Sequence, residues 1–172
     1  MKKVLKFAGA ISLLLTIAAM ILMMATPAVS YTVKAGSKED TSFISGVVGI
    51  FGGTDAGYAA PWAGLIGWIL VLVAVLLLVL GILIPIIKVK SLTKFAGLIN
   101  ICAVCCLVVA GVFMFLEKSA WVAANGDISF SLGGLASGTY GLGAGWVIGA
   151  ILAIAAGVFA ILPAAADFLS KK

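Results

Sequence analysis

Four long stretches without a single charged residue constrain the fold of this chain more than any other feature. They cover residues 7–30, 56–87, 95–116 and 128–166. About 20 consecutive apolar residues suffice to cross ~30 Å of hydrocarbon as a helix. In the second stretch the span is predicted to begin near Pro61 or Trp62. In the fourth it is predicted to begin near Leu142, because the preceding residues are rich in Gly and Ser. The pattern predicts an all-α membrane protein, a four-transmembrane-helix bundle.

The composition supports this class and argues against catalysis. Hydrophobic residues make up 64% of the 172 residues and charged residues only 10%, against about 45–50% and 25% in soluble domains. The chain contains no His, Arg or Gln, and all eleven basic residues are Lys. Histidine is the commonest general base and metal ligand. We therefore expect no enzyme activity, no catalytic residue, no cofactor, no metal and no nucleic-acid partner.

The lysines predict how the chain is oriented in the bilayer. Cytoplasmic loops carry an excess of Lys and Arg. One predicted side holds eight lysines and one aspartate, and the other holds three lysines and five acidic residues. The lysine-rich side comprises Lys2, Lys3, Lys6, Lys88, Lys90, Lys94, Lys171 and Lys172. We expect a multi-pass protein of the cell membrane with both termini in the cytoplasm and both long loops outside, so that the net charge of +5 reflects topology.

Three landmarks recur along the chain and indicate an internal duplication. Lys6-Phe7-Ala8-Gly9 returns as Lys94-Phe95-Ala96-Gly97, and Gly67-Trp68 returns as Gly145-Trp146, with a proline 17 residues after each Trp. The third landmark is an outer-loop pair whose repeated residues are Asp40, Ser42, Phe43 and Gly46, then Asp127, Ser129, Phe130 and Gly133.

The order of these landmarks predicts two copies of a helix–loop–helix unit. Residues 1–92 form the first transmembrane hairpin with its long outer loop, and residues 93–172 form the second. Both copies enter the membrane in the same direction, which predicts a pseudo-two-fold axis along the membrane normal. Residues 1–31 also look like a signal peptide. We expect them to be retained, because the apolar run is long and has a counterpart in the second copy.

The outer loops are predicted to carry a small β-hairpin cap. Tyr31–Lys34 and Thr41–Ile44 are β-prone and flank a turn at 36–40. In the second loop Asn125-Gly126 separates two further β-prone runs, which is a strong hairpin signal. Each hairpin is followed by a Gly-rich return with interspersed aromatic residues, at 49–57 and 133–145. These aromatics suit either a membrane interface or an adaptable contact surface.

This layout resembles that of claudin-type tetraspan proteins. The shared features are four spans, both termini inside, and an extracellular β element with a longer first loop. The resemblance covers layout only, and it assigns no residue a role.

Within the spans, small and polar residues indicate helix packing. Small residues at every fourth position form a stripe that permits close approach of another helix, within the bundle or in an oligomer. The members of this small-residue stripe are Gly141, Gly145, Gly149, Ala153 and Gly157. Asn100 and its predicted counterpart Ser12 are expected to face each other as polar packing residues. Cys102, Cys105 and Cys106 share one helical face, and we expect them to be small buried hydrophobes.

These observations favour a structural, assembly or interaction role that uses the outer loops and the small-residue stripe. The expected partners are the lipid bilayer and either a homo-oligomer or another membrane protein. The alternative is a small channel or transporter component. It would need a polar lining, for which only Ser12, Thr16, Asn100 and the cysteines are available. A membrane enzyme is the least favoured class, since Asp40 and Asp127 have no catalytic partners in the sequence.

Overall fold

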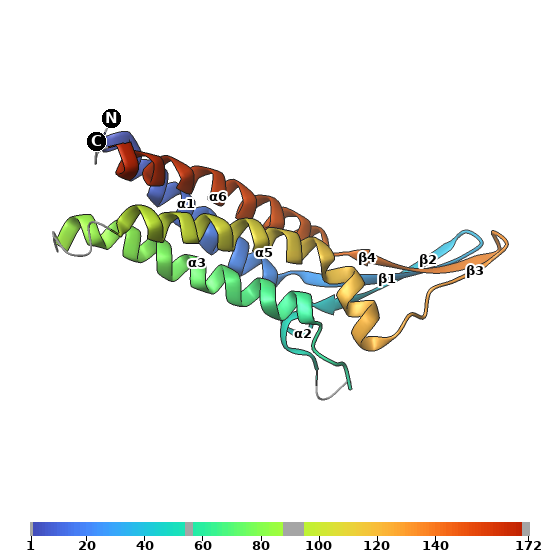
Figure 1. Cartoon of the computed structure of the whole chain (residues 1–172). Helices are drawn as coiled ribbons and strands as arrows, with labels where there is room; N and C mark the ends of the chain where they lie inside the picture. Colours follow the sequence, from blue (N-terminus) through green and yellow to red (C-terminus); the bar gives the residue numbers. More distant parts are fainter. Residues whose placement is uncertain (1, 54–56, 88–94, 170–172) are drawn as a thin grey trace.

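The computed structural model describes residues 2–53, 57–87 and 95–169. Four long helices lie side by side, and a small antiparallel sheet extends from one end of them (Figure 1). The predicted connection with Lys88, Lys90 and Lys94 lies outside the described residues, as do Asp55, Lys171 and Lys172.

All four long helices are long and apolar enough to cross a membrane, as the sequence predicts. They are α1 (Lys2–Ala25), α3 (Trp62–Ile87), α5 (Ala96–Asn125) and α6 (Ala144–Leu169). A 30-residue helix such as α5 is about 45 Å long at 1.5 Å per residue, which exceeds the hydrocarbon thickness. Hence one end of α5 reaches beyond the apolar layer when the bundle spans a bilayer.

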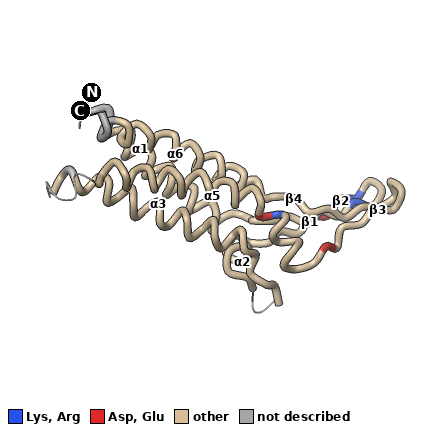
Figure 2. Tube along the Cα trace, in the orientation of Figure 1, with Lys and Arg blue, Asp and Glu red and all other residues tan. Residues whose placement is uncertain are grey.

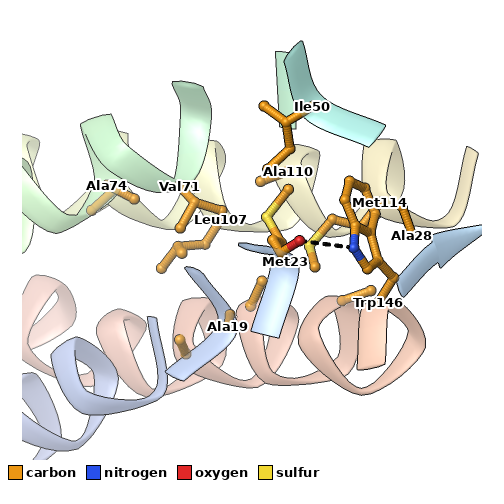
Figure 3. Close-up of a cluster of buried hydrophobic side chains, with 14 of the residues drawn as sticks. Ala19, Met23, Ala28, Ile50, Val71, Ala74, Leu107, Ala110, Met114 and Trp146 are labelled. Carbon is orange, nitrogen blue, oxygen red and sulfur yellow. Dashed lines mark hydrogen bonds between the residues drawn. The ribbon is translucent and has the colours of Figure 1, made fainter. Parts of the chain in front are cut away.

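Each long helix packs against two neighbours. Around the bundle the order is α1, α6, α5 and α3, with α1 and α3 in contact over a shorter stretch than the other neighbouring pairs. The interior contains mainly Ala, Leu, Val and Met side chains, including Ala19, Val71, Leu107 and Ala110 (Figure 3). Small side chains let the helix backbones approach closely, which is how helices associate where lipid surrounds them.

The sheet contains four strands, and all its pairings are antiparallel. They are β1 (Pro27–Ala35), β2 (Lys38–Ser45), β3 (Phe130–Leu132) and β4 (Ala136–Leu142), in the order β2-β1-β4-β3. β1 follows α1 directly and β4 leads directly into α6, so the two central strands continue the two helices. The strand pairing between β1 and β4 joins the two halves of the chain.

The predicted first hairpin is confirmed, but the second is wrong in position. β1 and β2 pair around Gly36, as expected. In the second half, Asn125-Gly126 is not a hairpin turn. Helix α5 continues past the predicted end at Leu116 to Asn125, and Gly126 terminates it with a positive φ of 89°. The hairpin turn lies instead at Gly133 and Gly134, whose φ angles of 52° and 84° suit glycine.

Two further boundaries differ from the prediction. The first span ends at Ala25, because Pro27 starts strand β1, a position where proline is tolerated. A short helix that the sequence pattern does not predict, α2 (Gly46–Phe51), follows strand β2 and overlaps the start of the Gly-rich return. The Ser45 side chain caps this helix by accepting a hydrogen bond from the Val48 N–H at 3.3 Å.

Candidate functional site

The four-stranded sheet is the part of the chain that extends beyond the helices (Figure 1). Its two outer strands, β2 and β3, have one paired side each within the sheet. Edge strands present unpaired N–H and C=O groups, which other chains can bind. The charged residues coloured in Figure 2 lie at this end of the bundle and on the sheet, and the middle of the bundle carries none.

The end of the sheet farthest from the helices carries exposed leucines. Leu135 is 79% exposed and Leu132 is 61% exposed. The two hairpin turns are joined there, because the Gly36 N–H donates to the Leu135 carbonyl at 3.0 Å. We call Leu132 and Leu135 the tip leucines. Water-exposed leucines on a glycine turn cost solvation energy that a partner surface would recover.

One face of the sheet is aromatic. The rings of Tyr31 and Tyr140 lie 4.9 Å apart between centroids and belong to directly paired residues of β1 and β4. The Tyr31 hydroxyl donates to the Ile128 carbonyl at 3.0 Å. Side chains of Tyr31 and Phe130 cover Gly138, where an added Cβ would collide with both. Glycine at this position therefore lets the Tyr31 hydroxyl and the Phe130 ring approach the strand closely.

The opposite face carries a row of threonines, and exposed Phe43 lies on the same face nearer the helices. The hydroxyls of Thr32 and Thr41 lie 3.0 Å apart, and Thr139 occupies the same row on β4. Next to this row the Lys34 ammonium forms an exposed ion pair with Glu39 at 3.0 Å. Exposed pairs of this kind contribute little to stability.

A shallow recess of about 400 Å³ lies between the end of α5 and strand β4. Lys118, Asp127 and Tyr140 are among the residues that line it. Hydrogen bonds from the Ser129 side chain and backbone N–H lower the pKa of the Asp127 carboxyl, with Ser129 N at 2.8 Å from Asp127 Oδ1. Burial raises the pKa of the Tyr140 hydroxyl, with a further contribution from Tyr31. The recess is mixed in charge and open, so it selects no ligand class.

The predicted outer-loop repeat falls on non-equivalent parts of the sheet. Asp40, Ser42 and Phe43 lie on β2, which runs toward the helices, and Gly46 begins α2. Asp127, Ser129 and Phe130 lead into and start β3, which runs away from the helices, and Gly133 lies in the following turn. A half-turn about the bundle axis preserves strand direction, so it cannot superpose these two segments.

A buried carboxylate lies at the sheet end of the bundle. Glu117 on α5 is fully buried, and its two carboxylate oxygens have no hydrogen-bond partner within the described part of the chain. The carboxylate lies against Gly49 of α2 and Gly64 of α3, where an added Cβ would lie 3.4 Å from Oε1 and 2.8 Å from Oε2, respectively. Gly64 is in the first turn of α3, where the helix dipole stabilises negative charge.

The sequence pattern does not point to Glu117, because a charge directly after the apolar residues 95–116 indicates only the end of a span. The signal that was available is the pair of glycines, Gly49 and Gly64, one in each element that covers the carboxylate. Nearby, Trp121 is buried, and its ring lies 5.1 Å from that of Tyr58. The Asn125 amide accepts from the Ala59 N–H at 2.8 Å and donates to the Ala59 carbonyl. These contacts fasten the end of α5 to the segment before α3.

The structure places most of the small-residue stripe inside the bundle. Gly149 faces α1 and α5, where an added Cβ would lie 2.6 Å from Met114 Cε and 3.5 Å from the Ala19 carbonyl oxygen. Ala153 is fully buried, Gly157 lies against Leu107 and Val108, and Gly145 lies against Thr26. Gly141 belongs to strand β4 and lies beside Ser30, so it is not part of a helical stripe.

Ser12 and Asn100 are buried, but they do not face each other as predicted. The Ser12 hydroxyl donates to the Ala156 carbonyl of α6 at 2.7 Å. The Asn100 side chain packs against Gly81 of α3. The bundle order explains the difference, because α1 and α5 lie on opposite corners and each contacts a partner helix instead.

The repeated tryptophans have different surroundings. The Trp146 indole N–H donates to the Met23 carbonyl at 3.0 Å inside the bundle (Figure 3). The Trp68 indole N–H is buried and has no acceptor among the described residues, and its ring lies 5.3 Å from that of Phe51. The hydrogen bond of Trp146 therefore fixes α6 on α1 at the point where the sheet begins.

The prediction that the cysteines are buried is wrong for two of the three. Cys102 and Cys105 are exposed on the surface of the bundle, and Cys106 is half-buried. The cysteines occupy the apolar part of α5, so their thiols are small groups on its lipid-facing side. Among the residues that the structure describes, no cluster of His, Cys, Asp or Glu is arranged to hold a metal ion.

Comparisons with known proteins place the chain in no family. No protein-family model matches it, and no curated protein sequence matches it.

Proposed function

We propose that this chain is a non-enzymatic membrane protein whose sheet mediates assembly with other membrane-protein molecules. The single observation that carries the proposal is the sheet itself, which extends past the helices with open edges and exposed tip leucines. Monomeric proteins rarely leave such surfaces uncovered. Most of the small-residue stripe packs inside the bundle, so the sheet is the remaining candidate for a contact surface.

The orientation that fits this role puts the sheet outside the cell membrane and both termini in the cytoplasm. The distribution of lysines supports it, because the loops expected on the sheet side contain more acidic than basic residues. Within the described chain, the sheet carries Lys34 and Lys38 together with Glu39 and Asp40, and so has no cationic excess.

We also infer that the two helix hairpins arose by duplication, and that the copy is confined to the helices. The bundle order supports this, since α1 lies opposite α5 and α3 lies opposite α6, as a half-turn about the bundle axis requires. The contacts of Ser12 with α6 and of Asn100 with α3 are also related by such a half-turn. The outer-loop segments are not related by this half-turn, so the inferred duplication does not include them.

A channel component is the second candidate, and buried Glu117 is the observation that favours it, because ionisable groups in membrane bundles commonly mark ion pathways. The two buried hydroxyl groups of α1, those of Ser12 and Thr16, weaken the channel candidate. The Ser12 hydroxyl is bound to Ala156, and the Thr16 hydroxyl donates to the Ser12 carbonyl at 2.8 Å. Neither hydroxyl is free to line a pore, so assembly is the better-supported function.

Complex size in native-lipid nanodiscs tests the proposed function. We expect the wild-type protein to be larger than a single copy, as itself or with another membrane protein. The variant Leu132→Ser/Leu135→Ser should shift it toward single copies, because the substitutions remove exposed apolar contact area. The matched control is Leu76→Ala/Leu80→Ala, which removes apolar area from exposed positions of α3 and should leave the size unchanged. Two results would contradict the proposal. One is a wild-type protein that is present only as single copies, and the other is a complex whose size falls in the α3 variant but not in the tip-leucine variant.

A further inference from the structure

The two edges of the sheet run in opposite directions, and this determines how copies can pair. β1 and β3 run away from the helices, whereas β2 and β4 run back toward them. The edge strands are β2 and β3, so one edge runs inward and the other outward.

Copies in one bilayer with the same orientation are related by rotation about the membrane normal and translation in the plane. Neither operation changes the direction of a strand relative to the membrane. A β2 edge beside another β2 edge, or β3 beside β3, is therefore a parallel pair. A β3 edge beside the β2 edge of a second copy is antiparallel, like every pairing inside the sheet, and antiparallel ladders are the more stable kind.

Charge also distinguishes the possible pairings. β2 begins with Lys38, Glu39 and Asp40, whereas β3 contains no charged residue. Pairing two β2 strands in parallel register would set lysine beside lysine and aspartate beside aspartate, which is destabilising. Opposite the uncharged β3, the charges of β2 meet no like charge.

The membrane fixes the register of such a pair. Val33 pairs with Asp40 on one side and Gly138 on the other, and Gly138 pairs with Phe130, so Asp40 and Phe130 lie at one level. By the same sheet register Glu39 is level with Ser131, and Lys38 with Leu132. Copies that sit at one depth in the bilayer therefore bring Glu39 opposite Ser131, and the Lys38 stem covers Leu132.

From these relations we infer that the partner of the sheet is a second copy of the chain, with β3 of one copy pairing antiparallel to β2 of the next. This inference rests on the proposed assembly function and names its partner and contact. The contact is head-to-tail, so in a pair of molecules one copy still has its β2 edge free and the other still has its β3 edge free. Repetition then gives a row of molecules in the membrane plane, or a ring where the rotation closes.

Disulfide trapping tests the contact directly. In a background with Cys102, Cys105 and Cys106 replaced by alanine, the double variant Glu39→Cys/Ser131→Cys places cysteines on opposite edges of one sheet. These edges are about 14 Å apart across three strand spacings, and a disulfide needs Cα atoms within about 7 Å. Any bond that forms must therefore join different molecules.

We expect mild oxidation of membranes to convert the double variant into a ladder of disulfide-linked multimers. Each single variant should remain uncrosslinked, because it has no cysteine opposite the new one. The matched control Lys34→Cys/Ser131→Cys replaces the edge position by one on the central strand β1 at the same level, and it should form no ladder.

The other results separate the two proposals. Dimers of Ser131→Cys alone would show β3 beside β3 and overturn the head-to-tail contact. No crosslinking of the double variant, in membranes where the nanodisc measurement still finds complexes, would overturn this contact while leaving assembly intact. Single copies by both measurements would overturn assembly as well.

Discussion

Substituting Gly64 with alanine should destabilise the protein strongly. Gly64 is in the first turn of α3, where an added Cβ would collide with the Gly49 backbone carbonyl of α2 and would lie 2.8 Å from Glu117 Oε2. A backbone oxygen cannot rotate away as a flexible side chain can, so α2 or α3 must shift. We expect a loss of about 1–3 kcal/mol or more from overpacking, observed as a lower apparent melting temperature in detergent.

The matched control is Gly9→Ala in α1. An added Cβ there meets only Ile82 Cγ1 at 3.8 Å, an ordinary contact. Alanine is the better helix former by roughly 0.5–1 kcal/mol, so this variant should be as stable as the wild type or more so. If both variants melted alike, the close packing of α2 on α3 around Glu117 would be refuted.

The second large effect is expected for Gly149→Leu. Gly149 lies where α6 crosses α1 and α5, and even an added Cβ would be 2.6 Å from Met114 Cε. The rest of a leucine side chain has no space unless the helices separate. We expect a folding yield far below that of the wild type and early melting of any purified protein, measured by size-exclusion chromatography and thermal denaturation in detergent.

Val158→Leu is the control on the same helix. Val158 is exposed on the outside of α6, where lipid accommodates added volume. The Val158→Leu variant should have the folding yield and melting temperature of the wild type. Wild-type yield and melting for Gly149→Leu would show that the stripe does not face the interior.

The membrane helices were predictable because hydropathy acts on whole segments. The start of α3 at Trp62 and the four-helix class follow from long apolar runs, and the first hairpin follows from alternating β-prone residues around Gly36. The position of the second hairpin was not predictable in this way. Asn125-Gly126 has the local signal of a turn, but α5 continues up to Asn125, where Trp121 contacts Tyr58 and Asn125 binds the Ala59 backbone.

The candidate site was only partly predictable. The lysine distribution identifies the two outer loops, which have more acidic than basic residues, as the surface on one side of the membrane. It does not reveal that β1 pairs with β4, because that pairing depends on how the two helix hairpins meet in space. Glu117 illustrates the same limit. A charged residue at the end of an apolar run indicates a membrane boundary, and only the fold reveals that Gly49 and Gly64 leave room to bury its carboxylate.

The side of the membrane on which the sheet lies decides whether it can meet partners outside the cell. Labelling intact cells with a membrane-impermeant thiol reagent measures this directly. In the background without native cysteines, Ser37→Cys lies in the β1–β2 turn and Ser91→Cys lies between α3 and α5 in the sequence. The proposed orientation predicts labelling of Ser37→Cys in intact cells and of Ser91→Cys only after permeabilisation. Labelling of Ser91→Cys in intact cells, with Ser37→Cys protected, would contradict a sheet that acts outside the cell.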